Sequence, residues 1–147
     1  MTHRVTVFNA HGRYREQGSS IRRYVRRVLR GEQVRRAVVR VVFIHSRYCR
    51  KINREFLGHD AVTDVISFPL EEGSNLEGEV YVNLDRARQQ AKEFQVTVPA
   101  EVARLVIHGT LHLVGYDDTT LRKAAVMKKR EDAHVRHWFP GNEKRKT

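Results

Sequence analysis

The sequence predicts an α+β fold, with one domain over residues 1–140 in which helices cover a mixed sheet of roughly four strands. Three observations support this fold class. The chain of 147 residues has the size of one domain. Segments of period two, rich in β-branched residues, are interspersed with segments of helical period. The two kinds of segment interleave too irregularly for a regular βαβ winding. We expect residues 141–147 to form a loose basic tail.

The first third of the chain predicts two strands and two helices. Residues 4–9 alternate with a period of two, and an amphipathic helix follows, capped by Ser19 or Ser20 and ended by Gly31. The apolar run "AVVRVVFIH" is typical of a central strand. The stretch "SRYCRKINREFLG" predicts a helix capped by Ser46. The buried stripe of the first helix is expected to consist of Ile21, Tyr24, Val25, Val28 and Leu29.

The remainder of the chain predicts two more strands and three more helices. "TDVISFP" and "GEVYVN" have the character of strands, joined by the loop "LEEGSNLEG". "LDRARQQAKEF" predicts an amphipathic helix. Pro99 opens the next helix, which runs to Gly115. A last helix is expected within residues 119–139, with Trp138 and Phe139 closing the core.

The charge of the chain points to an acidic partner. Its 28 Lys and Arg against 17 Asp and Glu give a formal net charge of +11, and nucleic acid is the commonest polyanion that such a protein meets. The single cysteine, Cys49, allows no intramolecular disulfide, and we expect it to be a small buried hydrophobe. No apolar run approaches the roughly 18 residues of a membrane span. We therefore expect a cytoplasmic protein with no membrane association.

The stretch "HGTLHLVGYDD" predicts a metal site at the end of a helix. His108 and His112 are four residues apart, so on a helix both imidazoles project from one face and can reach one cation. Gly115 can take the left-handed conformation that ends a helix, after which Asp118 can return toward the histidines. This spacing suits one divalent ion, and zinc is the ion we expect. In the alternative, Asp118 only caps the following helix and the site has two ligands.

The residue after the first histidine bears on the reaction. A zinc protease of the H-E-x-x-H kind needs a glutamate there as general base, and this chain has Gly109. Proteolysis is therefore disfavoured. A metal-activated water attacking a phosphodiester fits a strongly basic protein better.

Three stretches together carry a resemblance to a known family. "HGTLHLVGYDD" resembles the signature H-G-x-L-H-L-x-G-Y-D-H of the YbeY family, the bacterial metal-dependent endoribonucleases of ribosomal RNA maturation and ribosome quality control. "INREFLGHDAVTDVISFP" and "GEVYVN" resemble two further family motifs in the same order. The resemblance implies a small α+β fold, a bound zinc or similar ion as cofactor and hydrolysis of single-stranded RNA. Ribosomal RNA and ribosomal subunits are the implied partners.

Two positions depart from the family pattern. The family usually has a third histidine where this chain has Asp118, which adds a negative charge to the ligand set and shifts its preference toward harder metals. The family commonly carries an arginine, thought to serve the RNA phosphate, where this chain has Leu57. Arg50 and Arg54 are candidate substitutes. The alternative that both are ordinary solvated helix charges stays open.

Other charged residues are candidates for supporting roles. Asp64 and Glu79 are acids on or beside strands, and the resemblance implies that both lie near the cleft, where they could orient a ligand or a water. A structural hydrogen bond is the favoured alternative for Asp64. Asp117 is a further candidate, with surface exposure as its alternative. The polar face of the first helix could grip an RNA backbone or simply be solvated. That face contains Arg22, Arg23, Arg26 and Arg27.

Two functions thus remain from the sequence. In the first, the chain is a metal-dependent endoribonuclease in which His108, His112 and Asp118 are catalytic and hold the ion. In the second, it is a ribosome-associated RNA-binding factor with a structural metal and little or no catalysis. The departures at Leu57 and Asp118 keep the second hypothesis open.

Overall fold

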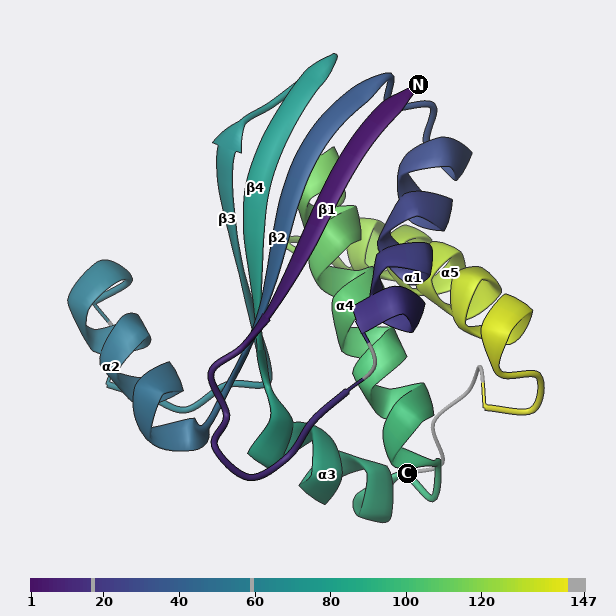
Figure 1. Cartoon of the computed structure of the whole chain (residues 1–147). Helices are drawn as coiled ribbons and strands as arrows, with labels where there is room; N and C mark the ends of the chain where they lie inside the picture. The colour runs from purple at the N-terminus through teal and green to yellow at the C-terminus, as the bar shows by residue number, and fades with distance from the viewer. Residues whose placement is uncertain (17, 59, 143–147) are drawn as a thin grey trace.

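A twisted four-stranded sheet forms one layer of the molecule, and most of the helices pack against one of its faces (Figure 1). The computed structural model describes residues 1–16, 18–58 and 60–142. The elements in chain order are β1 (Thr2–Asn9), α1 (Gly18–Gly31), β2 (Arg36–Ile44), α2 (Ser46–Phe56), β3 (Val65–Glu71), β4 (Asn75–Asn83), α3 (Leu84–Glu93), α4 (Val98–Val114) and α5 (Leu121–Trp138).

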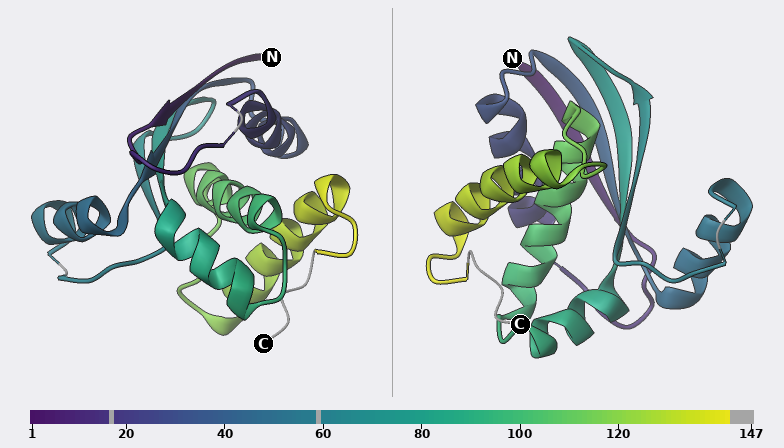
Figure 2. Two further views of the ribbon diagram at one scale, coloured as in Figure 1. Left: turned by 60° about the horizontal axis from the view of Figure 1, so that its bottom comes forward. Right: turned by 180° about the vertical axis from the view of Figure 1, so that it is seen from behind.

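The sheet is mixed, as the sequence predicts. Its strand order is β1-β2-β4-β3, with β1 parallel to β2, β2 parallel to β4, and β3 antiparallel to β4. Strand β3 therefore forms one edge of the sheet, beside the central strand β4. Helices α1, α4 and α5 lie on one face, whereas α2 stands at the end of the sheet on the other side (Figure 2).

Helix α4 is the centre of the core. It packs against β3 and β4 on one side and contacts α1, α3 and α5 on the others. A helix that is surrounded by other elements is mostly apolar, and α4 is buried along most of its length. The expected stripe of α1 is also buried as predicted, with all five of its residues in the main core.

Gly109 is a position where α4 packs tightly against the sheet. A Cβ atom at this position would lie 2.5 Å from Cγ1 of Val80 and 3.1 Å from Oγ of Ser67. The same Ser67 hydroxyl donates a hydrogen bond of 2.9 Å to the carbonyl of Gly109. This position therefore faces the helix–sheet interface, where a protease-type glutamate would have no room.

Several predicted boundaries differ in detail. The strands around the predicted loop "LEEGSNLEG" are longer than expected, since β3 runs to Glu71 and β4 starts at Asn75. Their antiparallel pairing continues beyond the segments whose alternation was evident in the sequence. The cap of α2 is His45 and not Ser46, because the His45 side chain accepts a hydrogen bond from the backbone amide of Tyr48. The predicted tail 141–147 lies outside the described residues from position 143 onward.

A smaller apolar cluster lies between α2 and the sheet. It contains Ile44, Ile52, Ile66 and Cys49, so the cysteine is a small buried hydrophobe as predicted. Burial raises the pKa of the Cys49 thiol above its ordinary value. In the part of the chain that the structure describes, no helix combines the length and the apolar character needed to cross a membrane.

Candidate metal centre and pocket

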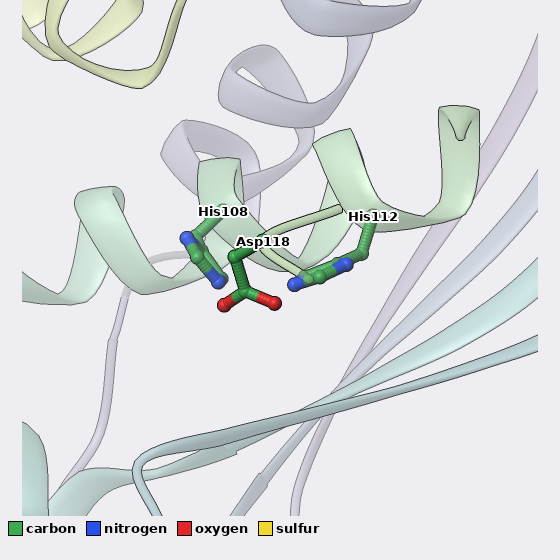
Figure 3. A group of neighbouring side chains, drawn as sticks. All are labelled: His108, His112 and Asp118. Atoms are coloured by element: carbon green, nitrogen blue, oxygen red, sulfur yellow. The ribbon is translucent and has the colours of Figure 1, made fainter. Parts of the chain in front are cut away.

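Helix α4 carries two histidines on one side of its last two turns. The ring centroids of His108 and His112 lie 4.8 Å apart, with their planes inclined by 74°. Gly115 ends the helix with φ 119°, and its amide donates to the carbonyls of Leu111 and His112. The chain then turns back, so that the carboxylate of Asp118 faces both rings (Figure 3).

These three side chains suit a single cation. One ligand atom from each of His108, His112 and Asp118 lies within 4.8 Å of the ligand atoms of the other two. Ligand atoms that share one ion at 2.0–2.2 Å are about 3 to 4 Å apart, so small side-chain rotations would complete the set. Two imidazoles and one carboxylate form a donor set that zinc accepts.

The turn between α4 and α5 decides against a purely capping role for Asp118. The cap of α5 is Thr120, whose hydroxyl accepts a hydrogen bond from the amide of Lys123. Asp117 is partly exposed, and its carboxylate accepts bonds from the amide and the hydroxyl of Thr119. Asp117 thus stabilises the turn, and Asp118 is left facing the histidines.

Glu131 of α5 contacts His108 through the ring nitrogen Nδ1. Its Oε1 lies 2.5 Å from Nδ1 of His108, and its Oε2 lies 2.5 Å from Nη1 of Arg104. Both Arg104 and Glu131 are buried. The Arg104 guanidinium also donates to Asp132, at 2.8 Å. These contacts connect the histidine to a buried group of charges that joins α4 to α5.

The two histidines have opposite pKa shifts. Burial by itself lowers the pKa of His108, but the hydrogen bond to Glu131 and the nearby negative charges outweigh it, so this pKa lies above its ordinary value. The pKa of His112 is lowered, first by burial and then by the charge of His108. Burial raises the pKa of Glu131, yet His108 and Arg104 more than compensate and hold it below its ordinary value.

The three candidate ligands face a pocket of about 570 Å³ between α4, β3 and the end of α2. Leu57, at the position of the family arginine, lines this pocket, as does Asp64. A neighbouring pocket of about 250 Å³ shares Asp64, His108 and Asp118 with it and includes Glu131. The complete lining of the larger pocket is Asn53, Leu57, Ala61, Thr63, Asp64, Val65, Ile66, Ser67, Pro69, His108, His112 and Asp118.

Asp64 makes structural hydrogen bonds and also lies at the wall of the site. Its carboxylate accepts hydrogen bonds from Gln90 at 3.2 Å and from the hydroxyl of Thr63 at 3.5 Å. It also lines both pockets beside His108 and Asp118. The structural contacts therefore hold this acid in place at the wall of the site.

Glu79 lies on the other face of the sheet. Its neighbours Gly78 and Val80 are buried on the α4 side, so the alternation of β4 directs Glu79 away from the histidines. Its carboxylate accepts bonds from Arg40, at 3.0 Å, and from the hydroxyl of Tyr81, at 3.2 Å. The expectation that Glu79 lies near the cleft does not agree with this placement.

The candidate RNA-binding arginines lie outside the pocket lining. Arg50 and Arg54 are both exposed on α2 and both donate to Asp60, at 2.7 Å and 3.3 Å. The bond from Arg50 is the largest influence that lowers the pKa of Asp60, to about 2.

Helix α1, which carries the other candidate arginines, packs on β1, α4 and α5, away from β3. From there Arg23 lies over the ring of Trp138. The remaining candidates on this helix are Arg22, Arg26 and Arg27.

Glu131 and Arg104 are the site residues that sequence reasoning missed. A signal was present for each. Glu131 occupies the buried stripe of α5 between Met127 and Val135, where an acid is unexpected. Arg104 stands one turn before His108 in a helix whose buried residues are mostly apolar. Neither signal identifies a contact between the two helices.

Comparison with known proteins decides the family. The family model of Endoribonuclease YbeY matches residues 8–138. This chain belongs to the YbeY family. Proteins named Endoribonuclease YbeY from Chlorobium phaeovibrioides and Chlorobium luteolum are 39% and 41% identical to it, over 80% of this chain and 80% and 85% of the relatives. The YbeY of Chloroherpeton thalassium is 37% identical over 84% of this chain and 88% of its own.

A solved structure agrees with the fold. The solution structure of TM1509 from Thermotoga maritima is 26% identical in sequence, with a TM-score of 0.63 over 95% of each chain. The predicted resemblance to the YbeY family and the predicted α+β class with its mixed four-stranded sheet are both confirmed.

Proposed function

We propose that this protein is a metal-dependent endoribonuclease that cleaves single-stranded RNA in ribosomal RNA maturation and ribosome quality control. The observation that carries the proposal is the group of His108, His112 and Asp118 facing a pocket of about 570 Å³. Relatives named as endoribonucleases and a net charge of +11 support it. Ribosomal subunits as partners and a cytoplasmic location belong to the same proposal.

The cofactor in this proposal is one divalent cation held by the three side chains, with zinc as the first candidate. Such an ion, when bound, supplies Lewis-acid activation of water and neutralises charge on a phosphate. The carboxylate of Asp118 adds one negative charge to the ligand set, which also suits harder ions such as manganese. Metal analysis of protein purified without chelator tests the identity of the ion.

The residues of the pocket have distinct roles in the proposed reaction. Asp64 is held by Gln90 and Thr63 at the wall of the site, where it orients the attacking group and accepts its proton. The apolar Leu57 contributes surface but no charge to the pocket, so phosphate recognition has to come from elsewhere. We assign that role to Arg50 and Arg54, which can leave Asp60 for a phosphate because both pairs are solvent-exposed. The α1 arginines would add salt-dependent contacts with more distant parts of the strand.

Cleavage of an end-labelled single-stranded RNA by the zinc-loaded protein tests the function. We expect His112→Ala to reduce the rate more than about 100-fold, because losing a ligand should cost at least as much as losing a residue that supports one. His137→Ala is the matched control, since His137 is exposed at the far end of α5. It should retain the rate of the unmodified protein.

Two outcomes would contradict the enzyme hypothesis. Cleavage that is undiminished in His112→Ala would point to a contaminating nuclease. A protein that binds one zinc ion and RNA, yet gives no metal-dependent cleavage, would instead support the ribosome-associated RNA-binding factor.

A further inference from the structure

Glu131 makes two contacts through its two carboxylate oxygens. Oε1 meets Nδ1 of His108 and Oε2 meets Nη1 of Arg104, each at 2.5 Å. Arg104 and His108 are four residues apart on α4, so one acid of α5 spans both of them. The exposed fractions of the side chains are 2% for Arg104 and 9% for Glu131, so water competes little for the contact between them.

Joining two helices through buried charged groups costs desolvation free energy. Replacing such groups with well-packed apolar residues is often neutral or stabilising. Glu131 lies on the buried stripe of α5, next to Met127 and Val135, where an apolar side chain would pack without an ionic partner. The ion pair with the buried Arg104 accounts for one oxygen of this acid, and the contact with His108 accounts for the other.

We propose that Glu131 is a positioning residue for the metal centre, which fixes the ring of His108 so that its Nε2 lone pair faces the cation. This inference rests on the proposed function, because it concerns the same site. A carboxylate accepts hydrogen bonds, so the ring proton of His108 stays on Nδ1 and the other nitrogen is free to act as a ligand. Figure 3 shows one ring nitrogen of His108 directed toward Asp118 and the other directed away from it.

Arg104 completes the arrangement by holding the second oxygen of Glu131. With both oxygens engaged, the carboxylate cannot rotate away from the imidazole. The neighbouring Asp132 also pairs with Arg104, at 2.8 Å, and with Lys128, at 3.6 Å. Among the described residues, the contacts of the Asp132 carboxylate are with Arg104 and Lys128 and not with His108. Asp132 thus shares the ion pair of Glu131 without sharing its contact with the candidate ligand.

The pair of variants Glu131→Gln and Asp132→Asn separates the two roles. Both groups that face Glu131 are donors, and an amide offers only one acceptor oxygen, so Glu131→Gln must present its NH2 group to one of them. We expect zinc affinity, measured by competition with a chromophoric chelator, to fall 10- to 100-fold in Glu131→Gln. Asp132→Asn should stay within about threefold of the unmodified protein, because its change leaves the histidine contact in place.

A measurement on the unmodified protein covers the case in which Glu131→Gln does not fold. Correlation of ring ¹⁵N and ¹H resonances in the zinc-loaded protein should place the proton of His108 on Nδ1 and the metal on Nε2. A proton on Nε2 would overturn the proposal. So would equal losses of affinity in the two variants, or zinc binding by Glu131→Gln that equals that of the unmodified protein.

These results are distinguishable from failure of the proposed function. If the unmodified protein binds one zinc ion and cleaves RNA but Glu131→Gln binds zinc equally well, only the positioning role fails. If the unmodified protein binds no divalent ion, the metal-dependent function fails and the positioning role fails with it.

Discussion

The molecule contains two partly buried histidine–carboxylate pairs whose second ring nitrogens have different surroundings. At one end of the sheet, Nε2 of His11 lies 2.8 Å from Asp85, and Nδ1 accepts bonds from the amides of Arg13 and Tyr14. In the second pair, Nδ1 of His108 meets Glu131, and the rest of the ring faces Asp118 and the pocket. Both pairs join segments that are distant in the sequence.

The difference lies in what the second ring nitrogen meets. Both nitrogens of His11 are used within the fold, so this ring holds the segment after β1 against α3 and has nothing left for a ligand. One nitrogen of His108 contacts Glu131, and the other is directed toward Asp118 at the pocket. A histidine–carboxylate pair therefore becomes a candidate for function only when one nitrogen remains available on the side of a pocket.

Replacing each histidine with alanine should give opposite results. We expect His108→Ala to lower zinc affinity and RNA cleavage more than about 100-fold. Its effect on the free energy of unfolding should be smaller, because Glu131 still pairs with Arg104. His11→Ala should cost about 1 to 3 kcal/mol of stability, since Asp85 and two amides lose a hydrogen-bonding partner.

Chemical denaturation of the apo proteins and zinc titration measure both quantities. The proposed difference between the two histidines is contradicted if His11→Ala weakens zinc binding as much as His108→Ala does. The same difference is contradicted if His108→Ala unfolds the protein while His11→Ala leaves its stability unchanged.

The glycines that follow the two histidines allow a second contrast. Gly109→Ala would place a Cβ 2.5 Å from Val80, where α4 packs tightly against the sheet, whereas a Cβ on Gly12 would meet no heavy atom within 4 Å. We expect Gly109→Ala to cost about 1 to 3 kcal/mol in the free energy of unfolding and to weaken zinc binding by displacing His108. Gly12→Ala should change neither by a measurable amount, and a loss of stability in Gly12→Ala as large as in Gly109→Ala would contradict the structure.

His134 extends the comparison to a buried histidine with no carboxylate contact of its own among the described residues. Burial, followed by the positive charges of Arg27 and Arg130, lowers its pKa to about 4, and Glu32 opposes this only in part. The unfolded chain therefore takes up this proton near pH 6.5, while the folded protein resists it until about pH 4. Stability from this group is present above pH 6.5 and is lost as the pH falls toward 4.

We expect His134→Gln to remove that loss, which is on the order of 2 kcal/mol. Urea denaturation at pH 7 and at pH 4.5 measures it as the change in the stability difference between variant and unmodified protein. Carboxylates that titrate between these two pH values contribute equally to both proteins. Their contributions therefore cancel in the stability difference. Parallel stability curves for the two proteins would show that His134 has an ordinary pKa in the fold.

Much of the candidate site could be predicted from the sequence because its geometry is local. The spacing of His108 and His112 places both rings on one helical face, and Gly115 supplies the left-handed residue that lets Asp118 return. The period of two in the strands and of 3.6 in the helices likewise predicted the α+β class and the buried stripe of α1. Such patterns depend on bond geometry over a few residues.

Contacts between distant segments could not be predicted in the same way. Glu131 reaches His108 across 23 residues, and no spacing rule connects positions on two separate helices. Glu79 was expected near the cleft, yet β4 packs against α4 through its other face. Arg50 and Arg54 were assigned to RNA without regard to Asp60, which the loop after α2 brings beside them.

The sequence by itself determined which residues could form the metal site and the helical turn that presents them. Only the tertiary structure decided that Asp118 faces the histidines instead of capping α5, that a buried acid of α5 contacts His108, and that Asp64 belongs to the pocket wall. The physical reason is the range of the forces involved. Backbone periodicity acts over one or two turns, whereas the side chain that meets a buried charge depends on how whole helices pack against the sheet.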